Sequence, residues 1–132
     1  MDLHFYQNAV ETVLLLFLII TFLQSGIDKV KDWKGNLSWL KGHFAESPFK
    51  NSVPLLLGIL TVTEIVAGVL CLAGLVHLLL HDNKTLALYG ALISCLALLM
   101  LFFGQRINKD YEGAKTIVIY LVPTVFLLFL LQ

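Results

Sequence analysis

The sequence predicts an all-α membrane protein, a four-transmembrane-helix bundle with an interfacial helix in the first loop. Of the 132 residues, 58% are hydrophobic and 14% are charged, and the apolar residues gather in four long blocks. The mean hydropathy is +0.86. A soluble domain of this length would need more polar residues to cover its surface, so soluble folds are excluded.

The four apolar blocks are residues 10–24, 53–80, 85–104 and 114–131. We interpret them as four spans of a single transmembrane domain. A helix needs roughly 20 apolar residues to cross a bilayer, so the first helix should begin near Phe5 and include Glu11 near the interface. The second block is longer than a perpendicular crossing requires, and its helix must tilt, kink or extend into water.

Small residues predict that the second and third spans pack closely. Those of the third span are Ala87, Gly90, Ala91, Ser94 and Cys95, expected to face Gly68, Cys71 and Gly74 of the second. Small side chains let two helix backbones approach each other, which favours a tight hairpin. The two cysteines, Cys71 and Cys95, are expected to be packing residues rather than a redox pair.

Basic residues are distributed unequally between the two ends of the predicted bundle. Of the nine Lys and Arg residues, only Lys84 lies in the second loop. The others lie in or beside the first and third loops: Lys29, Lys31, Lys34, Lys41, Lys50, Arg106, Lys109 and Lys115. The positive-inside rule then places these two loops in the cytoplasm and both chain termini on the other side.

The first loop is too long for a simple hairpin connection. Its apolar residues Trp33, Leu37, Leu40 and Phe44 recur at helical spacing, which predicts an interfacial helix that Asn36 could cap. A structured loop packed under the bundle is the alternative. The segment 31–35 also resembles 109–113, since each contains Lys-Asp, an aromatic residue and Gly in the same order. This similarity indicates either two related helical hairpins or chance.

Glu64 is the deepest acidic residue, about midway along the second span. An unpaired carboxylate there would cost about 2.5–3.5 kcal/mol, so Glu64 should be protonated or face a partner inside the bundle. The candidate partners are Gln24, Asp28, Lys29, Gln105 and Arg106, at the ends of the first and third spans. Glu64 is therefore either an interhelical link that fixes packing or a proton-handling or ligand-binding group.

Two tyrosines are further candidates. Tyr111 lies in the third loop, where it is either solvated surface or part of the same polar pocket. Tyr120 lies one turn from Pro123, whose ring removes a backbone hydrogen bond and should kink the fourth span. Its hydroxyl could line a cavity, although an aromatic ring in a helix interface is the commoner arrangement.

Several function classes are excluded or disfavoured. The formal net charge is zero, so no basic field exists to hold a nucleic acid. His77 and His81 share one helix face, but no carboxylate or cysteine completes a metal motif, and we predict no metal site. No Gly-rich phosphate loop or familiar catalytic motif is present, so we predict no catalytic residue.

The chain resembles the DoxX family of small four-helix bacterial membrane proteins. The resemblance rests on Gly26 with Lys29 after the first span, on Glu64 with Gly68, and on the segments 104–106 and 110–111. It implies a multi-pass protein of the bacterial cytoplasmic (inner) membrane, with periplasmic termini, that serves as an accessory subunit of respiratory or detoxifying redox assemblies. The fold is also similar to emopamil-binding and sigma-2-receptor-like proteins, which hold small hydrophobic molecules near acidic residues.

Two main functional hypotheses follow. The first is a non-catalytic accessory subunit of a larger membrane complex, respiratory or quinol-linked, that has no cofactor of its own and contacts lipids and other membrane subunits. The second is a binding protein or isomerase for a quinone, isoprenoid or other lipophile. In it Glu64 acts as acid or acceptor, while Arg106 or Lys29 orients the headgroup. A proton-coupled transporter is a weaker third, because four helices with one deep acid form a small pathway.

Overall fold

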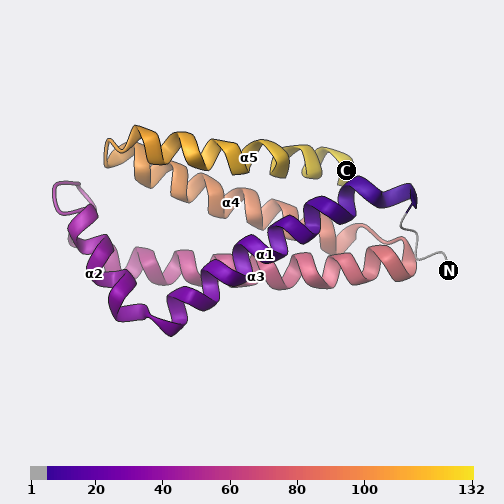
Figure 1. Cartoon of the computed structure of the whole chain (residues 1–132), viewed down its shortest axis with the longest axis horizontal. Helices are drawn as coiled ribbons and strands as arrows, with labels where there is room; N and C mark the ends of the chain where they lie inside the picture. Colours follow the sequence, from indigo (N-terminus) through magenta and orange to yellow (C-terminus); the bar gives the residue numbers. More distant parts are fainter. Residues whose placement is uncertain (1–5) are drawn as a thin grey trace.

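The computed structural model describes residues 6–132, and the expected helix start near Phe5 lies outside this range. Its elements are η1 (Tyr6–Asn8), α1 (Ala9–Lys31), α2 (Trp33–His43), α3 (Val53–His81), α4 (Thr85–Ile107) and α5 (Tyr111–Leu131). The long helices α1, α3, α4 and α5 lie side by side, with the short α2 at one end (Figure 1). The prediction of an all-α bundle with a short helix in the first loop is confirmed.

Four helices are long and apolar enough to cross a membrane. With η1 included, the first runs from Tyr6 to Lys31, and the most apolar stretches of the four have mean hydropathies between 2.0 and 2.4. Few of their residues are buried inside the bundle, between 22% and 39% of each stretch, so most side chains face outward. An apolar outward face is what lipid contact requires.

Three of the predicted span ends differ from the helix ends by three residues or more. The first helix continues beyond residue 24 to Lys31, α4 continues beyond residue 104 to Ile107, and α5 begins at Tyr111 rather than at residue 114. Hydropathy marks where apolar residues stop, whereas a helix continues as long as its backbone hydrogen bonds are made. The extension of α1 places Asp28 and Lys29 on a regular helix instead of in a loop.

The two similar segments both cap a helix. Asp32 accepts a hydrogen bond from the Gly35 amide at 3.3 Å at the start of α2, and Asp110 accepts one from Gly113 at 3.0 Å at the start of α5. The expectation that Asn36 caps α2 is wrong, because Asn36 lies inside the helix and its side chain donates to the Asp32 carbonyl oxygen. The similarity therefore reflects one capping sequence used twice.

The α3–α4 hairpin packs as closely as its small residues predict. A Cβ atom on Gly74 would overlap the backbone of Ala87, and one on Gly90 would lie 2.9 Å from the Cys71 amide nitrogen. Gly68 differs from the prediction, because it faces Leu23 of α1 rather than α4. Helix α3 therefore packs closely against two neighbours, against α1 at Gly68 and against α4 at Gly74.

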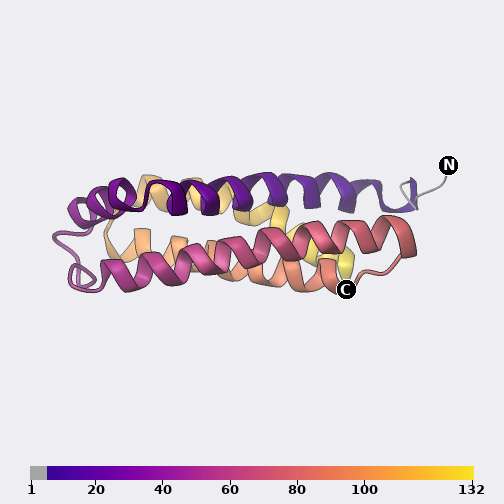
Figure 2. The ribbon, with the colours of Figure 1, turned by 90° about the horizontal axis from the view of Figure 1, so that it is seen from below.

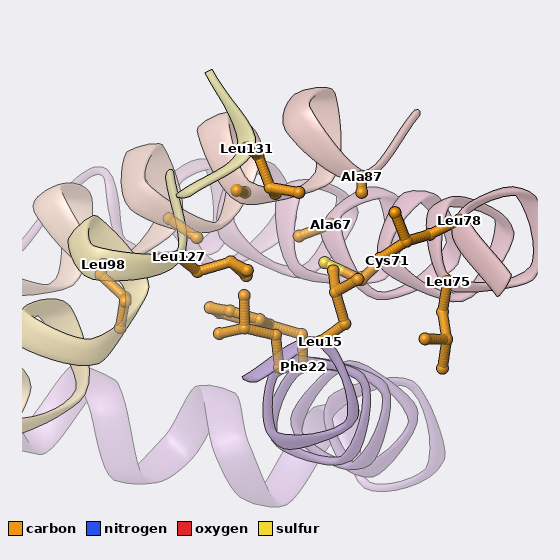
Figure 3. Close-up of a cluster of buried hydrophobic side chains, with 13 residues drawn as sticks. Leu15, Phe22, Ala67, Cys71, Leu75, Leu78, Ala87, Leu98, Leu127 and Leu131 are labelled. Carbon is orange, nitrogen blue, oxygen red and sulfur yellow. The ribbon is translucent and has the colours of Figure 1, made fainter. Parts of the chain in front are cut away.

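A cluster of buried apolar side chains joins the four helices. Leu15 and Phe22 of α1, Cys71 of α3 and Leu127 of α5 are at most 1% exposed, and Figure 3 shows them converging between the helices. Both cysteines are free and buried, in keeping with a packing role. Because lipid tails are as apolar as leucine, close van der Waals contact rather than exclusion from water holds this cluster together.

The two ends of the bundle are distinct. In Figure 2 the start of α1, the α3–α4 turn and the C-terminus lie toward one end of the bundle. At the other end, hereafter the α2 end, the Asn108 side chain donates to the His43 carbonyl oxygen at 2.8 Å and joins α2 to the α4–α5 turn. The first and third loops, which hold most basic residues, thus lie together. The orientation of this end toward the cytoplasm stays a prediction.

Candidate functional site

Glu64 forms an ion pair with Lys29. The Lys29 ammonium nitrogen lies 2.9 Å from Glu64 Oε1, and the two side chains are 16% and 3% exposed. Lys29 also donates a hydrogen bond to Ser25 Oγ, one helical turn earlier, at 2.6 Å. Among the candidate partners, Lys29 is the residue that neutralises the deep acid.

Two glycines bring these charges together. The antiparallel helices α1 and α3 approach closely where Gly26 meets Ile65 and Gly68 meets Leu23. A Cβ atom on Gly26 would lie 2.6 Å from Ile65 Cγ1, so a side chain there would push the helices apart. Lys29 follows Gly26 by three residues and Glu64 precedes Ile65 by one, so the same crossing sets the ion pair.

The Glu64 carboxylate has a close partner, the Lys29 ammonium. Glu64 is 2% exposed, and Lys29 Nζ lies 2.9 Å from its Oε1. No other group within residues 6–132 donates a hydrogen bond to this oxygen. Because a carboxylate has about four lone-pair sites, Glu64 can accept a further hydrogen bond from a hydroxyl or amide group.

Glu64 lines an open pocket of about 550 Å³ between α1, α4 and α5. The polar side chains of its wall are Thr21, Gln24, Ser25, Asp28, Glu64 and Tyr120. The apolar ones are Ile20, Phe22, Leu98, Leu101 and Ile117. The site combines a mainly apolar wall on α4 and α5 with a polar strip along α1, as pockets for small molecules often do.

Tyr120 marks the side of this pocket formed by α5. Its ring stacks on Phe17 of α1, with ring centroids 5.8 Å apart and an interplanar angle of 17°. Tyr120 therefore lies in a helix interface and also lines a pocket, so both positions considered from the sequence apply. The stacked rings join α1 to α5 beside the opening.

The structure divides the sequence-predicted site residues among three places. Gln24, Asp28 and Glu64 line the pocket, with Lys29 paired to Glu64. Arg106 and Tyr111 line a separate groove between α4 and α5 that shares no residue with the pocket. The Gln105 side chain instead lies 3.1 Å from His43.

His43 was not singled out by the sequence analysis. Its Nε2 atom lies near Gln105 Oε1 and 3.4 Å from Asp110 Oδ2, and its ring stacks on Trp39 with centroids 4.7 Å apart. No sequence motif signals this cluster, because its members come from three helices. Thr21 and Ser25, by contrast, could have been found, since they share a helix face with Asp28 once α1 is extended.

The opposite end of the bundle holds polar contacts of its own. Glu11, 7% exposed, lies 3.8 Å from the Lys84 ammonium, and Asn8 donates to Asp82 at 2.8 Å. The rings of His77 and His81 are 5.8 Å apart, but no group of three potential metal ligands occurs within residues 6–132.

No model of a known protein family matches the chain. No curated protein sequence matches it. No solved structure matches it.

Proposed function

We propose that this small multi-pass membrane protein binds an amphiphilic lipophile, such as a quinone or isoprenoid, in the pocket lined by Glu64. The observation that carries the proposal is a buried carboxylate, paired with Lys29 alone, on the wall of an open pocket between membrane-spanning helices of the described chain. Intramembrane ionisable residues usually mark functional sites, because their burial in lipid is costly. The site favours the second hypothesis from the sequence over the first.

The size and chemistry of the pocket suit such a ligand. Its volume of about 550 Å³ falls within the roughly 300–1,000 Å³ typical of small-molecule sites. Carboxylate oxygens of Glu64 can accept a hydrogen bond from a hydroxyl group, while Gln24 and Tyr120 can donate one to a carbonyl. An isoprenoid tail or quinone ring would contact Leu98 and Leu101. We assign no chemical reaction to the chain.

The test is to purify the protein from its native membrane and identify the bound lipophiles by mass spectrometry of organic extracts. We expect one defined quinone-like or isoprenoid species to be enriched over the membrane background. Thr21→Trp, which fills the pocket, and Glu64→Gln, which removes the charge, should each lower its occupancy by about tenfold, equivalent to about 1.4 kcal/mol.

The matched control is Val62→Trp, because Val62 is 63% exposed on α3 and lines neither the pocket nor the α4–α5 groove. It adds the same bulk at a lipid-facing position and should leave the occupancy unchanged. Equal lipophile profiles in all four proteins would contradict the proposal. All variants are compared at equal helical content, so that loss of folding is not read as loss of binding.

A second proposal is the accessory-subunit role that the DoxX resemblance implies, in a respiratory or quinol-linked assembly. One observation favours it. Beyond the α4–α5 groove, helix α5 presents large apolar residues outward, Val125, Phe126 and Phe129, each at least 48% exposed. Such a surface can dock on another transmembrane helix. Blue-native electrophoresis of gently extracted membranes should show a stoichiometric complex, and a lone chain would contradict this role.

A further inference from the structure

A second groove lies between α4 and α5 and is unrelated to the Glu64 pocket. Its volume is about 460 Å³, and it is open along its length. Arg106, Tyr111 and Lys115 form its polar end, and Phe102, Val118, Ile119 and Val122 form its apolar part. Because Arg106 is in the last turn of α4 and Tyr111 begins α5, the polar end lies at the α2 end of the bundle.

The two cations of this groove have no anionic partner within residues 6–132, because neither Arg106 nor Lys115 forms an ion pair with a carboxylate there. The Arg106 guanidinium instead lies 4.8 Å from the centroid of the Tyr111 ring, which holds it beside the groove. Two acids adjoin Tyr111 in sequence. The Asp110 carboxylate is used by the Gly113 amide and His43, and Glu112, three residues before Lys115, forms no ion pair with either cation.

The apolar part of the groove continues from this charged end along the membrane-spanning part of α5. Lys115, Val118, Ile119 and Val122 share one face of the helix, at spacings of three, four and seven residues from Lys115. Ile119 and Val122 are 65% and 64% exposed. This surface is complementary to a phospholipid. Its positively charged end can face the phosphate headgroup, and its apolar part can contact an acyl chain along the span.

We infer that this groove binds an anionic phospholipid, with its phosphate between Arg106 and Lys115 and an acyl chain along Val118, Ile119 and Val122. The unneutralised charges select an anionic headgroup over a zwitterionic one, because basic pockets between transmembrane helices attract anionic lipid. The inference does not rest on the lipophile pocket, because the two sites share no lining residue.

The test is native mass spectrometry of the detergent-solubilised full chain titrated with phosphatidylglycerol or with phosphatidylcholine of the same acyl chains. We expect phosphatidylglycerol to bind about tenfold more tightly, and the double variant Arg106→Gln/Lys115→Gln to lose this preference. The control Lys34→Gln/Lys41→Gln removes two charges from α2, outside the groove, and should keep it. Equal affinity of the unmodified chain for both lipids would overturn the inference, as would equal losses in the two double variants.

A second variant separates the headgroup from the acyl chain. Ile119→Trp fills the apolar part and leaves both charges in place, so it should weaken the binding of both lipids by about tenfold. Inorganic phosphate at millimolar concentration should not displace phosphatidylglycerol from the unmodified chain. Displacement by phosphate, or full lipid binding by Ile119→Trp, would show that the acyl chain does not occupy the groove and would overturn the inference. The lipophile of the Glu64 pocket should remain bound to the Arg106→Gln/Lys115→Gln variant.

Discussion

The side chains of Glu64 and Lys29 place opposite charges side by side in an apolar bundle. Their environments are unequal, because the Glu64 side chain is 3% exposed whereas the Lys29 side chain is 16% exposed and lies two residues before the end of α1. The long Lys29 stem can extend toward the headgroups if its partner is removed. The short Glu64 side chain cannot extend in this way.

This asymmetry predicts that replacing Lys29 by an uncharged residue and replacing Glu64 by an uncharged residue have unequal effects on stability. Lys29→Met should lower the free energy of unfolding by about 3 kcal/mol, because it leaves a buried carboxylate without its counterion. Glu64→Gln should cost less, and the double variant should recover at least half of the Lys29→Met loss. The measurement is unfolding by increasing SDS in mixed micelles.

Lys31→Met is the control, because Lys31 is exposed two residues further along α1 and has no ion pair within the described chain. It should change stability by less than about 0.5 kcal/mol. A double variant as unstable as the sum of the two single variants would mean that the charges are not coupled.

At the scale of the elements, glycines decide how closely the helices pack. Gly26 and Gly68 set the α1–α3 crossing, and Gly74 and Gly90 set the α3–α4 crossing. Gly42 of α2 differs, since nothing lies within 4 Å of the position its Cβ atom would take. The same residue type therefore has a packing role in the bundle and none at position 42 of α2.

We therefore expect a Gly→Ala substitution to have different effects on stability at Gly74 and at Gly42. Gly74→Ala should destabilise the bundle by about 1–3 kcal/mol, because the added methyl group meets the Ala87 backbone, which cannot move without shifting α4. Gly42→Ala should leave stability unchanged or raise it by up to about 1 kcal/mol, through its better helix propensity. SDS unfolding measures both. Equal destabilisation by the two substitutions would contradict the close α3–α4 contact.

At the scale of the whole molecule, the two ends of the bundle differ in charge. The first and third loops lie together at the α2 end, and every Lys and Arg of the sequence lies in or beside them except Lys84, which pairs with Glu11 at the opposite end. Charge bias of this kind sets the orientation of multi-pass proteins during insertion. We therefore predict that the α2 end faces the cytoplasm.

Cysteine labelling in intact cells tests this orientation. Asn83→Cys, in the α3–α4 turn, should react with a membrane-impermeant maleimide, and Lys41→Cys, in α2, should react only after the membrane is opened. The native Cys71 and Cys95 are 0% and 9% exposed and should remain unlabelled, which provides an internal control. The reverse pattern of labelling would contradict the prediction.

The number of spans, the close packing of the α3–α4 hairpin and the mid-span position of Glu64 can be predicted from the sequence. Each depends on local composition, which hydropathy and small-residue spacing record directly. Composition did not indicate the helix ends, because Asp28 and Lys29 are polar but still helical. Nor did it show that Asp32 rather than Asn36 caps α2, since both residue types suit that position.

Which polar residues share a site depends on how the helices pack in three dimensions. Gln105 and Arg106 are consecutive on α4, yet successive residues of a helix point about 100° apart. Gln105 therefore meets His43 while Arg106 faces the groove beside Tyr111, and neither lines the Glu64 pocket. Span depth can be read from hydropathy, but the direction in which a side chain points around its helix has meaning only once the neighbouring helices are in place.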